Sequence, residues 1–567
     1  MTFLRDYFIL WAELGALIVG LAVSLIVPDF GSSILSPFRS LLLWSSRRPS
    51  TAVAFAILIA PLLRLLAWPW VKLPYPAIHD EYSYLLLADT LASGRLTNLP
   101  HPFWIHFEAM HVLQQPTYAS TYPVMQGVFI AIGEAVVRAP WLGVWLSMSL
   151  FCGALYWMLK AWLPHFWSLA GTVLVAIRFG IFSYWMNSYW GGAPGALGGA
   201  LVLGALPRIF RYCRIRDACW LALGMAILAN SRPYEGFFFC LPVAFVFFAW
   251  LFGSDKTCHW LGFQPCPSGR GTRLRLLVPI ALILVVTGAG MNYYFWRVTG
   301  NAFKMPNSLE AEQYGITPLF IWQKLRPEPH YNTDTLRYFF TQIAARKTSQ
   351  AERFFDYWRI YLGPALTFPL LLGVAAFRDR RVRFLLAVIL AVLVAVAIEW
   401  WARPHYAAPM TGALFAMVLQ SLRHMRVTFM RDSGASSRWR GLVALAPVVV
   451  LLMIPAQLVL PRIPIEQTID ILFGAPTLYR QASPRLQIEQ FLMKQGPKHL
   501  ILVRYTNHEN DFRIHDEWVY NSANIDQQPI VWARELDEER NRKLREYYKD
   551  RRIWLCSPDE SMLVPWD

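Results

Sequence analysis

Apolar runs long enough to cross a lipid bilayer recur along this 567-residue chain. An α-helix needs about 20 apolar residues to span the hydrocarbon layer. Short segments rich in arginine or in aromatic residues separate the runs, as in multispan membrane proteins. The pattern predicts about twelve spanning helices, at residues 8–27, 51–70, 141–161, 165–183, 193–208, 217–230, 236–252, 274–292, 359–377, 384–401, 404–422 and 440–460. The predicted fold class is therefore mainly α, a polytopic bundle of membrane helices.

The distribution of basic residues predicts which loops face the cytoplasm, because cytoplasmic loops of multispan proteins collect arginine and lysine. The loops rich in these residues are 207–217, 253–275, 378–383 and 423–440. Residues 71–122 contain only two basic residues, Lys72 and Arg95, against four acids. We therefore expect residues 71–140, the first outer loop, to face outward, together with residues 293–358, the long outer segment, which we expect to form short helices on the membrane face.

One apolar stretch, residues 123–138, is not counted as a span. A crossing there would invert the arginine pattern of every later loop, so we expect a helix lying in the outer interface. The predicted division is an extra transmembrane helix with a cytoplasmic loop over residues 1–50, a transmembrane domain over 51–460 and an outer domain over 461–567.

The outer domain at the C-terminus differs in character from the rest of the chain. Short apolar runs at 499–504, 529–533 and 552–556 are typical of buried strands, and residues 484–495 and 535–549 have helical patterns between charged segments. The sequence therefore predicts a small soluble α/β domain.

Composition supports this organisation. The chain is 55% hydrophobic and 16% charged, whereas a soluble domain carries about a quarter of charged residues. Its net charge of +16 is spread over separate short loops and so lacks the continuous basic surface that nucleic-acid binding needs. We expect membrane lipids around the chain and no nucleic-acid partner.

Two adjacent acids, Asp80 and Glu81, open the polar part of the first outer loop directly after a predicted span. They fit a helix N-terminus, where Asp80 caps the helix and Glu81 favours its dipole. They equally fit a catalytic pair, in which one carboxylate acts as general base and the other orients the acceptor or holds a cation. His79 and Tyr82 flank the pair as candidate sugar- or acceptor-binding residues.

The same loop contains several further polar candidates. The spacing of His101, His106, Glu108 and His111 matches no compact zinc pattern, so we predict no metal, although a divalent ion is not excluded. Later in the loop, Gln115 and Tyr118 are candidate sugar- or acceptor-binding residues.

A predicted second outer loop, residues 184–192, is dense in aromatic and amide groups. Sugars stack on aromatic faces and bond to amides, so Asn187, Tyr189 and Trp190 are candidate sugar ligands. A membrane-interface aromatic belt is the alternative explanation.

Charged residues also occur at the ends of predicted spans. Arg232 and Glu235 should pair with each other or line a polar cavity, and Glu235 is also a candidate sugar- or acceptor-binding residue. Arg403 can bind a phosphate through its fork of donors, with His405 and Tyr406 adding hydrogen bonds. An arginine that snorkels beside aromatic residues is the alternative for this element.

Over residues 50–425 this layout resembles the GT-C superfamily of integral-membrane glycosyltransferases, in particular the bacterial group similar to protein O-mannosyltransferases and lipid A aminoarabinose transferases. The resemblance rests on Asp80 and Glu81 after a helix, the interfacial segment, the polar second outer loop, and the Arg403-Pro404-His405-Tyr406 element before a late helix.

The resemblance implies transfer of a sugar from a polyprenyl-phosphate carrier to an envelope acceptor (protein, lipid or polysaccharide), with inversion, on the outer side of a bacterial inner membrane. Asp80 would be the general base, and Arg403, His405, Tyr406 and Arg232 would hold the donor phosphate. Metal-dependent members carry further acids in the second outer loop, where this chain has none. The resemblance therefore implies transfer without a metal cofactor.

Three other features bear on this interpretation. The sequence His515-Asp516-Glu517-Trp518 is similar to the sequence around Asp80. We interpret it as coincidence or as a feature of the outer domain. A flippase for lipid-linked sugars is the main alternative function, but no two related halves are visible in the sequence. A non-catalytic envelope-assembly protein is the other alternative function.

Overall fold

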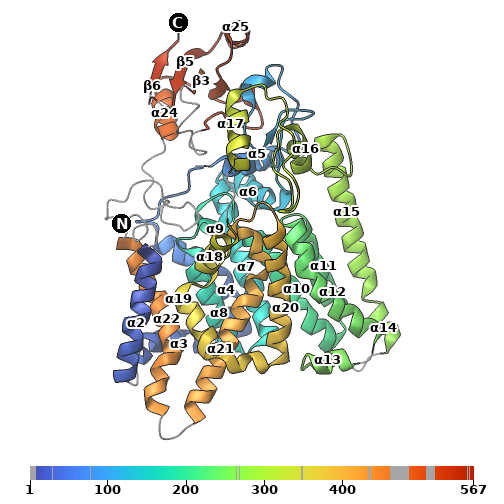
Figure 1. Cartoon of the computed structure of the whole chain (residues 1–567), viewed down its shortest axis with the longest axis vertical. Coiled ribbons are helices and arrows are strands. Elements are labelled where there is room, and N and C mark those ends of the chain that lie inside the picture. The colour runs from blue at the N-terminus through green and yellow to red at the C-terminus, as the bar shows by residue number, and fades with distance from the viewer. Residues whose placement is uncertain are drawn as a thin grey trace.

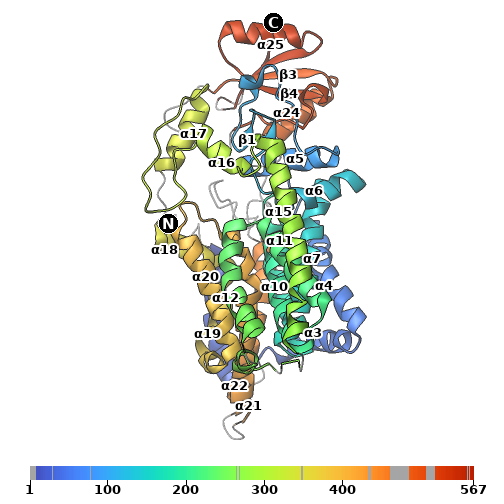
Figure 2. The ribbon, with the colours of Figure 1, turned by 90° about the vertical axis from the view of Figure 1, so that its right-hand side faces the viewer.

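The structure is a computed structural model of the whole chain. It describes residues 8–27, 30–76, 78–253, 255–263, 265–266, 269–345, 349–431, 436–459, 484–505, 517–558, 560 and 562–566. A bundle of long helices occupies one end of the molecule and a small sheet with helices occupies the other (Figure 1). Turned by 90°, the same arrangement shows α5 (His79–Ala92) and α6 (Val124–Val137) between the bundle and the sheet (Figure 2).

Eight helical stretches among the described residues are long and apolar enough to cross a membrane. They are α2 (Phe8–Ile26), α4 (Pro49–Leu66), α7 (Pro140–Trp162), α10 (Ala193–Tyr212), α12 (Pro233–Phe252), Arg270–Thr299 with α14 (Arg270–Leu274) and α15 (Leu277–Thr299), α20 (Arg380–Ile398), and Gly441–Leu458 within α22 (Ser436–Val459). All eight coincide with predicted spans, so the polytopic helical fold is confirmed. Four of them, α4, α7, α10 and α12, carry proline in the first turn, where its missing N–H costs nothing.

The predicted number of spans is not confirmed. Two predicted spans form α8 (His165–Gly180) and α11 (Ile215–Ala229), which have only 16 and 15 residues. Another breaks into α19 (Gly363–Leu372) and η2 (Val374–Arg378). The span predicted at 404–422 begins as the 3₁₀-helix η3 (Pro404–Met410) before α21 (Thr411–Arg431). The short helix α13 (Lys256–Trp260) and the longer α3 (Ser32–Ser46) occupy segments that the sequence assigned to cytoplasmic loops.

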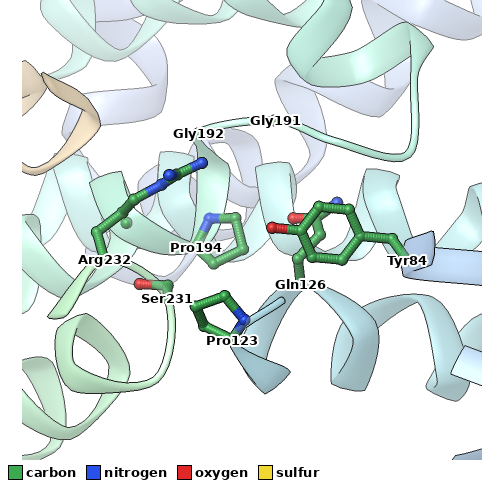
Figure 3. A pocket seen from close by; sticks show the side chains of 9 residues that line it. Tyr84, Pro123, Gln126, Gly191, Gly192, Pro194, Ser231 and Arg232 are labelled. Carbon is green, nitrogen blue, oxygen red and sulfur yellow. The ribbon is translucent and has the colours of Figure 1, made fainter. Parts of the chain in front are cut away.

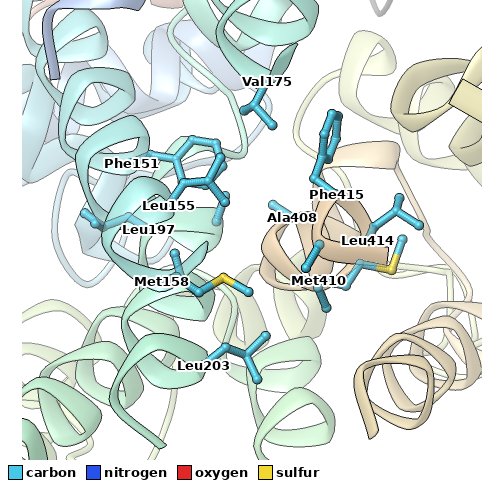
Figure 4. Packing of buried hydrophobic residues seen from close by; sticks show 14 of the residues in the cluster. Phe151, Leu155, Met158, Val175, Leu197, Leu203, Ala408, Met410, Leu414 and Phe415 are labelled. Atoms are coloured by element: carbon cyan, nitrogen blue, oxygen red, sulfur yellow. The ribbon is translucent and has the colours of Figure 1, made fainter. Parts of the chain in front are cut away.

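The centre of the bundle is packed around the small residues of α10. A Cβ atom on Gly199 would lie 2.1 Å from the carbonyl oxygen of Pro409, so η3 approaches the α10 backbone directly. Apolar side chains of α7, such as Phe151 and Met158, face Met410 and Phe415 across this region (Figure 4). The glycine contact therefore fixes the depth of η3, the element that follows Arg403.

Short elements form an outer layer. Besides α5 and α6 they are η1 (Trp104–Phe107), β1 (Val112–Leu113), β2 (Ala119–Ser120), α9 (Tyr184–Asn187), α16 (Pro306–Gln313), α17 (Asp334–Ala345) and α18 (Gln350–Tyr361). The long outer segment does form short helices. They pack on the first outer loop, where Ile316, Leu336 and Phe339 enclose Met110.

The predicted α/β domain is present at the C-terminus. It consists of α24 (Pro484–Met493), β3 (His499–Val503), η6 (Ile525–Gln527), β4 (Ile530–Arg534), α25 (Glu538–Tyr547), β5 (Arg552–Ser557) and β6 (Met562–Pro565). The strand order is β4-β3-β5-β6, with the first three parallel and β6 antiparallel. The strand β6 was not predicted, and the predicted boundary at residue 461 lies outside the described residues.

The C-terminal domain and the first outer loop share one hydrophobic core. Leu500, Leu502 and Val531 of the sheet pack in the same cluster as Leu86 and Phe107 of the loop. The two regions therefore form one outer layer above the bundle (Figure 2).

Candidate functional site

Asp80 lies in the first turn of α5 with 16% of its side chain exposed. The hydroxyl of Tyr122 donates a hydrogen bond to its Oδ1, and the Nδ1 atom of His79 lies 3.1 Å from its Oδ2. Burial alone would raise the pKa of the Asp80 carboxyl, but nearby positive charges and the tyrosine hydrogen bond outweigh burial and lower it. Arg403 is one of those charges. Asp80 is therefore ionised at neutral pH.

Glu81 has a different environment from its neighbour. It is fully buried, and its Oε1 accepts a hydrogen bond from the backbone N–H of Tyr189 at 3.0 Å. Its Oε2 accepts from the N–H of Ile78 at the start of α5, at 3.4 Å. Glu81 thus caps the helix and ties it to the second outer loop, while the Asp80 carboxylate faces the tyrosine and histidines.

Two histidines border Asp80. The rings of His79 and His111 lie 4.8 Å apart, and Nδ1 of His111 lies 3.1 Å from Glu310 of α16. Burial opposes protonation of His111, but Glu310 and Asp80 raise its pKa to about 9.

The same side chains have the donor types and spacing of a metal site. One ligand atom from each of His79, Asp80 and His111 lies within 4.8 Å of the other two. Imidazole and carboxylate ligands suit ions such as Zn²⁺, and a carboxylate on the second ring nitrogen, as Glu310 provides, commonly orients such a histidine. The triad therefore fits a divalent cation, which would act at Asp80 as a Lewis acid in place of a free base.

The other histidines of the first outer loop contact the C-terminal domain instead. His101 lies 3.2 Å from Asp526, and Nδ1 of His106 lies 2.8 Å from the carbonyl oxygen of Arg534. Glu108 accepts hydrogen bonds from Tyr314 and Asn332, both at 2.9 Å. The loop histidines thus divide between two regions, and only His111 joins His79.

In the similar sequence at residues 515–518, His515 and Asp516 lie outside the described residues. Glu517 is buried in an ion pair of 2.6 Å with Arg534, which agrees with a structural role in the C-terminal domain.

A pocket opens beside α5, with about 250 Å³ of empty space, its mouth included. It is lined by Tyr84, Pro123, Gln126, Gly191, Gly192, Pro194, Gly195, Ser231 and Arg232. Tyr84 and Arg232 face one another across it (Figure 3). Tyr84 also stacks on Tyr122 at 4.5 Å, and Tyr122 binds Asp80. The pocket is thus connected to Asp80 through two tyrosine rings.

The opposite side of the pocket adjoins the predicted phosphate element. The guanidinium of Arg232 lies 4.2 Å above the ring of Tyr406. Arg403 is exposed, while its carbonyl oxygen accepts a hydrogen bond of 3.0 Å from Tyr357 of α18. His405 is buried, with Nδ1 3.1 Å from the hydroxyl of Tyr184. The structure therefore brings together Asp80, Arg232, Arg403 and Tyr406, while His405 lies beneath them.

Glu235 belongs to this region as well. It is buried in the first turn of α12 and interacts electrostatically with Arg232, as does Glu399 at the end of α20. Two buried acids thus lie within the electrostatic reach of Arg232.

The predicted sugar ligands of the second outer loop are engaged within the protein. Oδ1 of Asn187 accepts a hydrogen bond from Arg64 at 2.7 Å, and its amide donates to backbone carbonyls. The Tyr189 hydroxyl donates to the carbonyl of Pro74 at 3.2 Å. Trp190 is buried against His405, with ring centroids 4.7 Å apart.

Three other candidates contact the outer layer. Tyr82 stacks on Tyr520 at 4.5 Å, and the hydroxyl of Tyr118 donates to the carbonyl oxygen of Asn521 at 2.9 Å. The carbonyl oxygen of Gln115 accepts from Gln313 at 3.1 Å. The structure does not bring these residues to the pocket.

Sequence reasoning missed several residues around the pocket. Tyr84 lies one helical turn after Asp80 and so shares its face of α5, a signal that the sequence contains. Tyr122 and Pro123 are adjacent in the loop. Gln126 is a single polar residue inside an apolar helix, and only its place in the fold distinguishes it.

Comparison with known proteins gives structural likenesses only. No protein-family profile matches the sequence, and no curated protein matches it. ArnT from Cupriavidus metallidurans matches in the apo state with a TM-score of 0.46, 13% identity, and coverage of 80% of this chain and 83% of that one. The same protein bound to undecaprenyl phosphate gives a TM-score of 0.43, 13% identity, and coverage of 81% and 84%.

The oligosaccharyltransferase of Archaeoglobus fulgidus, in complex with Zn and sulfate, matches with a TM-score of 0.42 and 15% identity over 79% of this chain. The chain covers 55% of the length of that protein. These likenesses concern the fold alone.

Proposed function

We propose that this protein is a glycosyltransferase that moves a sugar from a polyprenyl-phosphate carrier to an envelope acceptor, on the outer face of a bacterial inner membrane. The observation that carries the proposal is the placement of Asp80. The ionised, partly exposed Asp80 carboxylate accepts from Tyr122, which stacks on Tyr84 at one wall of a polar pocket, and Arg232, which lies over Tyr406, forms the opposite wall. A base and an anion site on opposite sides of the reacting sugar are what an inverting displacement needs.

The reaction is a single displacement. The Asp80 carboxylate takes the proton of the acceptor hydroxyl while that oxygen forms a bond to the anomeric carbon. The bond from that carbon to the phosphate oxygen breaks, and its electron pair leaves with the polyprenyl phosphate. No covalent enzyme intermediate is formed, so no nucleophilic serine or cysteine is required.

The leaving phosphate gains negative charge as the bond breaks, and fixed donors must meet that charge. Arg403 is suited to this because its side chain is exposed while its backbone is held. Tyr357 donates to its carbonyl oxygen, and Tyr361 donates to that of Pro404 at 2.9 Å. The guanidinium can therefore bind a lipid phosphate in a bidentate manner from an anchored backbone segment.

The decisive experiment measures release of the carrier lipid. Purified protein is incubated with labelled polyprenyl-phosphate hexoses and pentoses, and Asp80→Asn is compared with Asp89→Asn. Asp89 is on the same helix but accepts a hydrogen bond from the backbone of Ala523. Loss of a general base should lower the rate about 10²- to 10⁴-fold, whereas Asp89→Asn should retain turnover. Full turnover by Asp80→Asn would contradict its role as base.

A second experiment separates transfer from transport. Vesicles containing a flippase would move the lipid-linked sugar between leaflets without releasing free polyprenyl phosphate. Arg403→Gln should weaken donor binding about tenfold, the loss expected for one charge-assisted hydrogen bond. Arg337→Gln, which breaks a surface pair with Glu328, is the matched control. Translocation without release would favour the flippase.

A further inference from the structure

We infer that the pocket between Tyr84 and Arg232 is the subsite for a single neutral sugar of the donor. We also infer that Gln126 accepts a hydrogen bond from one hydroxyl group of that sugar. The inference rests on the proposed function and adds the substrate class and a specificity-determining residue. Gln126 is not among the residues that the sequence suggested.

The position of the pocket identifies which group of the donor it holds. Tyr84 forms one wall and stacks on Tyr122, the hydrogen-bond donor to Asp80. Arg232 forms the opposite wall and lies over Tyr406 (Figure 3). In an inverting displacement the reacting sugar lies between the base and the leaving phosphate. The pocket occupies that place.

Gln126 presents an unsatisfied acceptor at this position. Its side chain is 5% exposed, and its Nε2 donates to the carbonyl oxygen of Tyr189 at 3.0 Å. That bond fixes the amide, so Oε1 is the free end. Among the described residues Oε1 has no hydrogen-bond partner, although it is buried. A buried acceptor of this kind is costly unless a ligand or water donates to it.

Ser231, which lines the same pocket, also presents an acceptor. The hydroxyl of Ser231 donates to the carbonyl oxygen of Ile227 at 2.7 Å, so its lone pairs remain available. Two acceptors require a ligand that brings donors, as sugar hydroxyls do. A phosphate offers only acceptors at neutral pH and is disfavoured beside Gln126 and Ser231, so the phosphate belongs at the Arg232 wall, where the guanidinium can donate.

The remaining walls suit the C–H surface of one sugar ring. Pro123 and Pro194 are apolar, and Gly191 and Gly192 present only backbone. A Cβ on Gly192 would lie 2.3 Å from the ring of Trp185, so that wall must be glycine. The empty space of about 250 Å³ includes the open mouth of the pocket.

Gln126→Leu tests the assignment, and Gln114→Leu is a matched control. Gln114 is equally buried in the first outer loop, its Nε2 donates to the carbonyl of Phe107, and its Oε1 also has no partner among the described residues. Two quantities are measured for each variant: kcat/KM with polyprenyl-phosphate hexoses and their monodeoxy analogues, and binding of sugar-free polyprenyl phosphate.

Gln126→Leu should lower kcat/KM for the preferred hexose about tenfold and leave binding of free polyprenyl phosphate unchanged. It should also abolish the wild-type preference over one particular deoxy analogue, because the hydroxyl then has no partner. Gln114→Leu should retain both the preference and the affinity. If Gln126→Leu does not fold, Ser231→Ala should show the same separation at a different hydroxyl.

Two results would overturn the subsite. One is a variant that keeps the full wild-type discrimination among deoxy donors. The other is a variant that weakens free polyprenyl phosphate as much as the hexose donor. Failure of the proposed function is distinct, because the wild-type protein would then release carrier from no donor. Binding of a polyprenyl-phosphate hexose against free polyprenyl phosphate would still decide whether Gln126 contacts a sugar.

Discussion

Replacing Asn187 with leucine is expected to destabilise the fold and to leave sugar recognition intact. Asn187 is 1% exposed, and its Oδ1 accepts from the Nε of Arg64, a fully buried arginine of α4. Its amide donates to the carbonyl oxygens of Ile181 at 2.7 Å and Ser183 at 3.0 Å. All of its hydrogen-bonding capacity in the structure therefore holds the second outer loop on the bundle.

The size of the effect follows from those bonds. A hydrogen bond to a charged group contributes about 1.5–3 kcal/mol and each neutral one about 1 kcal/mol. Removing Asn187 leaves the Arg64 guanidinium buried with one partner fewer, since its Nη2 still donates to Lys72 at 2.8 Å. The three bonds together contribute about 3.5–5 kcal/mol. The loss is a large part of a typical stability of about 5–15 kcal/mol.

The assay compares thermal unfolding in detergent with kcat/KM below the unfolding transition. Asn187→Leu should lower Tm clearly while the deoxy-donor preference is retained. The double variant Arg64→Met/Asn187→Leu should lose less stability than the two single losses combined, because no unpaired charge remains buried. An unchanged Tm together with weaker donor discrimination would refute the structural role and restore Asn187 as a sugar ligand.

Three further outcomes are expected. The pKa of His111 lies at about 9, above its ordinary 6.5, so the pair with Glu310 stabilises the fold fully below pH 6.5 and loses that contribution as pH rises through about 9. The stability gap between wild type and Glu310→Gln, measured by denaturant unfolding, should therefore close with rising pH, and a constant gap would contradict the pairing. Activity should survive dialysis against EDTA, whereas a loss restored by Zn²⁺ would assign His79, Asp80 and His111 to a metal. Glu13→Leu should lower Tm, because Arg178, 3.3 Å away, loses its buried partner; a matching Tm would contradict this.

The helical framework and the C-terminal strands could be predicted because their signals are local. An apolar run as long as the bilayer is thick predicts a span without knowledge of its neighbours. The limits of the method appear where the chain bends: the span predicted at 404–422 begins as the 3₁₀-helix η3. Its apolar composition predicted a continuous helix, but Pro404 and Pro409 break the regular helix.

The role of a polar residue was harder to predict, because its partners are distant in sequence. Asn187 and Gln126 are both buried amides beside the same loop. Composition favoured Asn187 as a ligand since it lies among aromatic residues, yet Arg64 occupies its acceptor oxygen. Gln126 lies in an apolar helix without a motif, and its amide oxygen has no hydrogen-bond partner among the described residues. Only the tertiary contacts distinguish the two.

The helix α5 shows why adjacency in sequence is a poor guide to shared function. Successive residues of an α-helix point about 100° apart, so Asp80, Glu81 and Tyr82 face three different regions. Asp80 shares its face with Tyr84, one turn later, and both belong to the pocket side. Glu81 binds the second outer loop, while Tyr82 and Asp89 contact the C-terminal domain. The acidic pair that suggested a catalytic site therefore separates into the proposed base, Asp80, and a structural cap, Glu81. The C-terminal domain holds the far face of α5 and thereby fixes the direction in which Asp80 points.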